Sequence, residues 1–524
     1  MNTRLLFFFY IRRERLSLVI WILALAGTTA AVAISFEELY ATEAEIEALK
    51  HIISNPAITA MVGPAFGLDH YTLGAMMSHQ MLLFTILAVA IMNIVMTARH
   101  TRADEETGRM EQVEALPLGR LASLFALFLL LLLANGLIAL TTALALIGLG
   151  LDGTGSFLYG AVLGLGGLFF ASLTALGAQV FRSSRTVLAF SFAVLIWAYI
   201  QRAAGDMEAE ILSYTSPLGL LLYTEVYVNN YLWPLGIIFV LCLILFSLAF
   251  FLKARRDLGS SLIGERAGKA RGGKMFQTPF RFIFRLQFGL IFAWLLGIYL
   301  LAASYASMLG ELEYFLENLS FIEDMLPKAG EGTLLEQFLV MLMSVMSLLC
   351  LIPGILILLR LYKEEEDNRM EPLLTTGVSR GRILGTYISL SVMTSIVMLL
   401  ITVLGFYSVS SFVTEEKIAL VSFLKLALGY LPAILVMLGL TTLIIGGFPG
   451  LRGLLWLYLA YSFIVIYLGD LLDFPEVLDY LTPFGYVLSF PLDGRGIVES
   501  MVLLALSLSL FLLGLGFYRR RDLR

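Results

Sequence analysis

Twelve apolar segments without charged residues follow one another along the chain of 524 residues, and they constrain its fold more than any other feature. Most are about 20 residues long, which is enough for a helix to cross a hydrocarbon layer of about 30 Å. Lipid offers no hydrogen-bond partner to the backbone, so segments of this length cross a membrane as helices. The segments lie at 16–36, 79–98, 121–149, 156–181, 186–201, 232–252, 286–308, 337–359, 383–408, 426–446, 453–469 and 500–517. The pattern predicts an all-α polytopic membrane protein with 12 transmembrane helices.

The composition excludes several function classes. Hydrophobic residues make up 59% of the chain and charged residues 14%, whereas soluble proteins carry about 25% charged residues. A cytosolic enzyme, a nucleic-acid-binding protein and a disordered scaffold are therefore excluded. No His, Cys, Asp and Glu cluster has metal-ligand spacing, so we expect no metal site and no catalytic residues. The stretch 264–270 is one residue too short for a phosphate-binding loop and lacks its Ser or Thr, so we expect no cofactor in this chain.

The positive charges predict the orientation in the membrane. If both termini lie on the same side, the segments on that side hold 29 of the 35 Lys and Arg residues. The same segments hold only 14 of the 40 Asp and Glu residues. Because Lys and Arg accumulate in cytoplasmic loops during insertion, both termini are predicted to be cytoplasmic. The expected location is a prokaryotic cell membrane.

The two halves of the chain resemble each other. The stretch 104–111 matches 364–371 at an offset of 260, so that Arg109-Met-Glu111 aligns with Arg369-Met-Glu371. Three further blocks match in the same order at offsets of 265 to 267, and they begin at Phe181, Tyr214 and Arg255. Since each half has six segments, we expect two parallel six-helix repeats related by an axis along the membrane normal. The predicted domains are 1–252 and 276–524, joined by a basic, Gly-rich cytoplasmic linker at 253–275.

The matched segments after the second and eighth apolar runs are acidic, on a side where acidic residues are scarce. Glu105 and Arg109 stand four residues apart, as do Glu365 and Arg369, which favours pairing along a helix. One interpretation is a solvated helix end with surface ion pairs. We favour a second interpretation, a docking surface for a cytoplasmic partner, because exposed pairs alone stabilise a helix by only about 0.5 kcal/mol. The candidate docking residues are Glu105, Glu106, Arg109, Glu111, Arg120, Glu365, Glu366, Arg369, Glu371 and Arg380.

Few polar residues lie inside the apolar runs. His79 and Gln80 stand at the outer end of the second run, and Asn93 lies within it. All three are candidates to line a substrate path. The alternatives are interface anchoring for His79 and Gln80, and an interhelical hydrogen bond for Asn93.

The acidic segment with its sequence Gly108-Arg-Met-Glu111, followed by Ala115-Leu-Pro-Leu-Gly-Arg120 and another apolar run, resembles the permease subunit of type-2 ABC exporters. The fused two-half form is similar to permeases that export polyketide or tetronasin-like antibiotics. The resemblance implies that the ten candidate docking residues contact two separately encoded ATPase subunits, which would hold ATP and Mg²⁺. It also implies a hydrophobic or amphipathic cargo in a lipid environment. The second copy departs from the first at Asn368, Pro372 and Gly377, so the two docking sites need not be equivalent.

Two other functions remain open. An ion-gradient-driven secondary transporter also has twelve helices in parallel halves, but it needs a titratable residue in mid-membrane, and none is found there. A membrane-embedded lipid-modifying enzyme needs clustered carboxylates or histidines, yet all four histidines lie in the first hundred residues. The sequence therefore favours the permease of an ATP-driven exporter.

Overall fold

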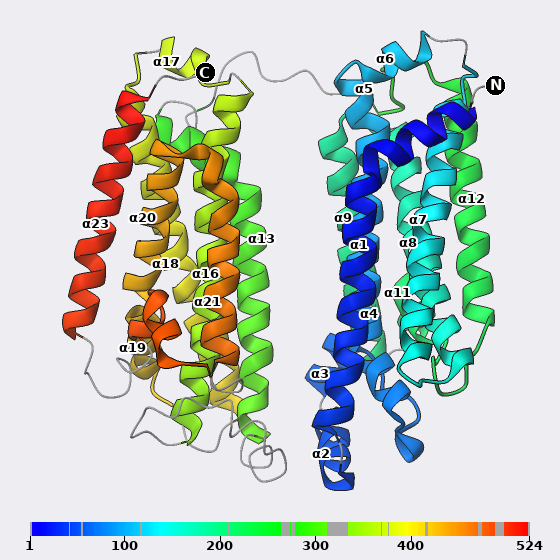
Figure 1. Cartoon of the computed structure of the whole chain (residues 1–524), viewed down its shortest axis with the longest axis horizontal. Coiled ribbons are helices and arrows are strands. Elements are labelled where there is room, and N and C mark those ends of the chain that lie inside the picture. Colours follow the sequence, from blue (N-terminus) through cyan, green and yellow to red (C-terminus); the bar gives the residue numbers. More distant parts are fainter. Residues whose placement is uncertain are drawn as a thin grey trace. The chain divides into compact units, whose positions relative to one another are not determined.

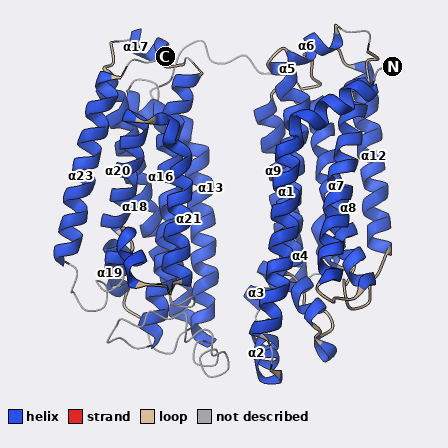
Figure 2. Ribbon diagram, in the orientation of Figure 1, coloured by secondary structure: helices blue, strands red, loops and turns tan. Residues whose placement is uncertain are grey.

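The computed structural model describes residues 3–521 apart from 41, 54–55, 116–117, 208–209, 264–272, 274–277, 312–333, 368, 376, 414–417, 470–473 and 488–496. The described residues form helices joined by loops, without a strand (Figure 2). Twelve of these helices are long and apolar enough to cross a membrane. The predicted all-α polytopic membrane fold is thereby confirmed.

The chain divides into two compact units, Met1–Gly268 and Lys269–Arg524, which are described separately (Figure 1). The helices of unit 1 are α1 (Thr3–Leu39), α2 (Glu43–Ile53), α3 (Pro56–Val62), α4 (Leu73–Ala98), α5 (Asp104–Glu106), α6 (Arg109–Glu114), α7 (Ala122–Gly148), α8 (Gly153–Val180), α9 (Ser184–Met207), α10 (Glu210–Thr215), α11 (Pro217–Leu222) and α12 (Trp233–Arg255). The helices of unit 2 are α13 (Pro279–Ser307), α16 (Leu334–Glu366), α17 (Glu371–Thr375), α18 (Arg380–Val413), α19 (Leu420–Gly429), α20 (Leu431–Gly447), α21 (Arg452–Leu468) and α23 (Ile497–Arg520).

Several helices extend beyond the apolar runs that predicted them. The second membrane helix, α4, begins at Leu73 and continues past Ala98 through the π-helical turn Arg99–Ala103 into α5. Charged residues end an apolar run but not a helix, because a helix that leaves the hydrocarbon layer keeps its backbone hydrogen bonds. For the same reason α12 continues to Arg255, into the predicted linker. Residues 264–272 and 274–275 of that linker lie outside the described residues, and the domain boundaries stay a prediction.

Small residues bring the central helices of each unit close together. In unit 1, α8 packs against α4, α7, α9 and α12, and a Cβ on Gly160 would overlap the backbone oxygen of Ala139 in α7. In unit 2, α20 packs against α16, α18, α21 and α23, and a Cβ on Gly446 would overlap the backbone of Gly514 in α23. Glycine at such contacts lets membrane helices approach closely enough for dense packing. The fourth membrane helix of each unit, α8 or α20, thus packs against the second, third, fifth and sixth, while the repeat organisation itself stays a prediction.

A pair of amides joins α4 to α7 in the interior of unit 1. The Nδ2 of Asn93 donates to Oδ1 of Asn135 over 2.9 Å, and Nδ2 of Asn135 donates to Oδ1 of Asn93 over 2.8 Å. Each side chain also donates to a carbonyl of its own helix. Both residues are buried, and Gly167 of α8 lies against the pair. Asn93 therefore makes the interhelical hydrogen bond that was the alternative to a substrate contact.

We expect Gly167→Ala to destabilise unit 1 by about 1–3 kcal/mol, because its Cβ would overlap both amides and no side chain can move away without losing a hydrogen bond. Thermal unfolding of the purified protein in detergent measures the change. Gly136→Ala is the matched control, since nothing lies within 4 Å of a Cβ at that position in α7. Equal stability of the two variants would contradict the amide contact.

Candidate functional site

The two acidic segments lie at one end of their units. In unit 1, α5 and α6 stand at the end where the N-terminus lies, and in unit 2, α17 stands at the end near the C-terminus (Figure 1). The turn between α5 and α6 contains Gly108 with a φ of 71°, which favours glycine. Each segment follows directly on its unit's second membrane helix, and is therefore positioned by that helix.

Glu105 points into unit 1. Its side chain is 7% exposed and lies among three cations, Arg102, Lys253 and Arg256. The carboxylate is 2.7 Å from Nη1 of Arg102, 3.6 Å from Nζ of Lys253, and hydrogen-bonded to Arg256. Since Lys253 and Arg256 belong to the end of α12, Glu105 ties the acidic segment to the last membrane helix of its unit.

Glu365 makes the corresponding contact in unit 2. Its side chain is 8% exposed, forms an ion pair with Arg521, and accepts a hydrogen bond of 2.5 Å from the hydroxyl of Tyr518. Both partners lie at the end of α23, the last membrane helix of unit 2. Arg521 matches Arg256 at the offset of 265 found in the sequence. Equivalent carboxylates and equivalent arginines thus meet in both units.

Arg120 and Arg380 support the same junction. Arg120 donates 2.9 Å to the backbone oxygen of Arg256, and Arg380 donates 2.9 Å to the backbone oxygen of Arg521. Arg120 also pairs with Asp257 over 2.8 Å. These two predicted docking residues are therefore engaged within their own units, although the Arg120 side chain keeps about half of its exposure.

The expected pairing of Glu105 with Arg109 and of Glu365 with Arg369 is wrong. Arg109 lies 3.6 Å from Asp104, and Arg369 lies 3.4 Å from Glu364. The helix is interrupted by a turn before each arginine, so residues four apart no longer stand on one face. The carboxylate that was expected at the surface is drawn instead to the basic end of the last helix.

The remaining acidic docking candidates lie on the surface, whereas Asp104 and Glu364 are buried. Glu106, Glu111, Glu366 and Glu371 are exposed, together with Arg109 and Arg369. Glu106 accepts hydrogen bonds from the backbone nitrogen, over 2.8 Å, and the hydroxyl of Ser184, where α9 begins. Glu366 accepts a longer one of 3.4 Å from Tyr362. For Glu111 and Glu371, no partner lies among the residues that the structure describes.

Unit 1 has a further junction that the sequence did not reveal. Glu14 of α1, with a side chain 3% exposed, accepts hydrogen bonds from Arg99 and His100 at the end of α4. Arg13 donates to Asp104 over 2.6 Å. The N-terminal turns of α1 are thereby fixed to the start of the acidic segment. No local pattern pairs residues 85 or more positions apart, so nothing in the sequence indicated these partners.

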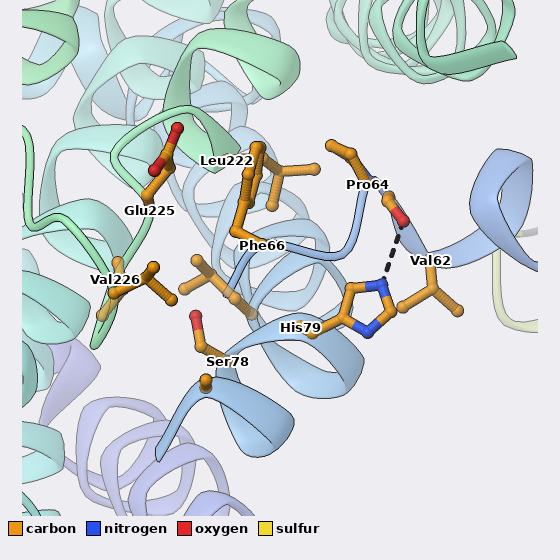
Figure 3. A pocket seen from close by; sticks show the side chains of 12 residues that line it. Val62, Pro64, Phe66, Ser78, His79, Leu222, Glu225 and Val226 are labelled. Carbon is orange, nitrogen blue, oxygen red and sulfur yellow. Dashed lines mark hydrogen bonds between the residues drawn. The ribbon is translucent and has the colours of Figure 1, made fainter. Parts of the chain in front are cut away.

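The predicted path residues His79 and Gln80 lie at the opposite end of α4. His79 lines a small cavity with Val62, Phe66, Leu222 and Glu225 (Figure 3). Its Nε2 is 3.0 Å from the backbone oxygen of Gly63, and its Nδ1 is 3.0 Å from the hydroxyl of Tyr71. The carbonyl only accepts, so Nε2 carries the proton and His79 holds this loop in place. Gln80 is half-buried beside it, and the cavity wall does not include it.

No group of three potential metal ligands exists within the described part of the chain. What the geometry defines is a membrane protein with two surface-exposed acidic segments, each anchored through a buried carboxylate.

Comparisons with known proteins agree with that class. Residues 276–519 match the family model described as "Multidrug efflux system permease Rv1217c, C-terminal domain". The multidrug efflux system permease protein Rv1217c of Mycobacterium tuberculosis (strain ATCC 25618 / H37Rv) is 33% identical over 524 residues, which cover 98% of this chain and 94% of that protein. The chain is thus a polytopic membrane permease. It belongs to the family of the Rv1217c multidrug efflux permease.

The contacts of the buried carboxylates predict that two arginine variants differ in stability. Arg256→Gln leaves Glu105 with Arg102 and Lys253, whereas Arg521→Gln leaves Glu365 without a cation among the described residues. We expect Arg521→Gln to cost about 3–5 kcal/mol of stability and Arg256→Gln distinctly less.

Thermal unfolding in detergent measures this difference, with the exposed Arg520→Gln as control. If Arg521→Gln unfolds no earlier than Arg256→Gln, the contact of Glu365 with Arg521 does not neutralise the carboxylate.

Proposed function

We propose that this chain is the permease subunit of an ATP-driven, ABC-type exporter, and that two cytoplasmic ATPase subunits dock on the acidic segments. The observation that carries the proposal is the pair of surface-exposed acidic segments, each joined through a buried carboxylate to the last helix of its unit. Membership in a multidrug efflux permease family supports transport of drug-like cargo. The ATPase partners hold ATP and Mg²⁺, and this chain needs no nucleotide site.

The structure divides the predicted docking residues into two groups. Glu106, Arg109, Glu111, Glu366, Arg369 and Glu371 are exposed and form the proposed contact surface. Glu105 and Glu365 are positioning residues, because their carboxylates are covered by the permease itself. Arg120 and Arg380 hold the same junctions from the side of the third membrane helix.

These junctions suggest how ATPase movement reaches the membrane. A displacement of α5 and α6 reaches α12 through Glu105. It also reaches α4, because α5 continues that helix. In unit 2, Glu365 lies in the last turn of α16, so a displacement of α17 that moves the end of α16 is passed on to α23. ATP binding shifts the permease between states only if the ATPase contacts those states with different free energies.

The cargo is proposed to be hydrophobic or amphipathic, such as an antibiotic or a lipid-like compound. Many buried Ser and Thr hydroxyls of the membrane helices donate to carbonyls of their own helix. The two amides of the Asn93–Asn135 pair bind each other, so these polar groups are engaged within the protein.

The proposed location is the cell membrane, with both termini in the cytoplasm. Green fluorescent protein fused to Arg524 becomes fluorescent if the C-terminus is cytoplasmic. It does not become fluorescent if it crosses the membrane in the unfolded state. We expect a fluorescent fusion, whereas alkaline phosphatase at the same position should be inactive. The opposite result would reverse the orientation.

Charge reversal tests the docking surface. Glu111→Lys combined with Glu371→Lys should abolish co-purification of the ATPase, because both carboxylates are exposed and free of internal contacts that the structure describes. We prefer these positions to Glu106 and Glu366, because those two side chains accept hydrogen bonds inside the permease and their reversal could also disturb its fold.

Glu210→Lys is the matched control, since it is exposed at the opposite end of unit 1. Unchanged co-purification of the double variant would overturn the docking proposal. Transport by the purified chain alone under an ion gradient would favour a secondary transporter instead.

A further inference from the structure

An open groove runs between α1 and α4 near the end of unit 1 that carries the acidic segment. It encloses about 400 Å³ with its mouth included. The residues that line it are Glu14, Ser17, Leu18, Trp21, Met92, Val95, Met96 and Arg99. Its polar residues all lie at one end, near the membrane surface, and its apolar residues extend from there along both helices.

The apolar wall suits a hydrocarbon chain. Leu18, Met92 and Met96 are buried, and Trp21 is half-buried. Val95 is 40% exposed on the outer surface of α4, so the groove opens sideways. Methionine side chains adapt to differently shaped apolar partners, and two of them form the floor of this groove.

Hydrogen-bond capacity at the polar end favours an acceptor-rich ligand. Glu14 accepts from Nη1 of Arg99 over 3.1 and 3.2 Å and from Nε2 of His100 over 3.1 Å. The buried carboxylate is therefore satisfied. Arg99 is half-exposed, and its contacts with the described residues use Nη1 alone. A guanidinium has five N–H donors, so Nε and Nη2 of Arg99 remain available.

Unused guanidinium donors beside an apolar wall suit an amphiphile with an anionic head and an apolar chain. Guanidinium binds carboxylate and phosphate through paired hydrogen bonds. We propose that the α1–α4 groove binds an amphiphile whose anionic head, a carboxylate or a phosphate, contacts Arg99 while its apolar chain lies against Trp21, Met92 and Val95.

The proposal deepens the proposed function, because in an exporter this groove would admit an anionic cargo sideways from the inner leaflet. The same head-group chemistry also occurs in anionic phospholipids. At the offset of 260, Arg99 corresponds to Leu359 in unit 2. Unit 2 therefore lacks the guanidinium, and the expected stoichiometry is one anionic amphiphile per chain.

Trp21 provides a direct readout of the groove. The full chain with Trp197, Trp233, Trp294 and Trp456 replaced by Phe keeps Trp21 as its single tryptophan, which is excited selectively at wavelengths where tyrosine does not absorb. In phosphatidylcholine nanodiscs, 9,10-dibromostearate should quench Trp21 saturably at one molecule per chain. Arg99→Gln should weaken this binding at least tenfold, and Arg99→Lys should keep it within about threefold. Dibromostearyl alcohol, which has no charge, should quench without saturation.

A second variant leaves the ion pair intact. Val95→Phe narrows the groove and should reduce dibromostearate binding as strongly as Arg99→Gln. Ile91→Phe is the matched control, because Ile91 is 39% exposed one turn away on α4 and does not line the groove. We expect Ile91→Phe to bind like the parent chain.

Competition between dibromostearate and phosphatidylglycerol shows whether the ligand is a single-chain cargo or a membrane lipid. If dibromostearate still quenches in nanodiscs that contain phosphatidylglycerol, the groove selects a single-chain cargo. If brominated phosphatidylglycerol quenches saturably and stearate does not displace it, the anionic amphiphile is a membrane lipid. Equal quenching by acid and alcohol, or binding unaffected by Arg99→Gln and Val95→Phe, would overturn the proposal.

The assay contains neither ATP nor an ATPase. A failure of binding therefore leaves the exporter proposal intact, and a failure of ATPase co-purification leaves groove binding measurable.

Discussion

Lipid provides no hydrogen-bond partner, and every polar group that enters the hydrocarbon layer must find its partner within the protein. The backbone meets this requirement as twelve membrane helices. Asn93 and Asn135 meet it by binding each other. At the membrane surface, Glu105 and Glu365 meet it with cations from the last helix of their units. The same constraint that creates the helices thus also creates the contacts that hold them together.

The buried carboxylates fix the acidic segments to the membrane helices. A wholly solvated charged helix could move without consequence for the membrane domain, because exposed ion pairs contribute little free energy. Here each segment directly follows the second membrane helix of its unit, and Glu105 or Glu365 binds the end of that helix to the last one. Breaking a buried ion pair is costly. In the proposed exporter, a force on the exposed carboxylates would therefore reach two membrane helices at once.

The two units meet the same constraints with different side chains. Where unit 1 has His100 hydrogen-bonded to Glu14, unit 2 has Arg360, at the offset of 260, bound to Glu364 over 2.5 Å. In mid-membrane, the counterpart of Asn93 is Pro353 inside α16. A proline removes a backbone hydrogen bond and bends its helix. The amide pair of unit 1 instead holds α4 against α7. Equivalent positions thus differ in local structure, and we expect the two units to respond differently to the proposed ATPase subunits.

The sequence by itself determined the helical membrane fold, because apolar length and the positions of charged residues are local properties. It also located the acidic segments and their matching copies. It did not distinguish Glu105 from Glu106, which are neighbours of the same residue type. Only the tertiary structure buries the first against Arg256, 151 residues away, and leaves the second exposed. The direction in which a helical side chain points is set by the helix, but the group that it meets there is set by how distant helices pack.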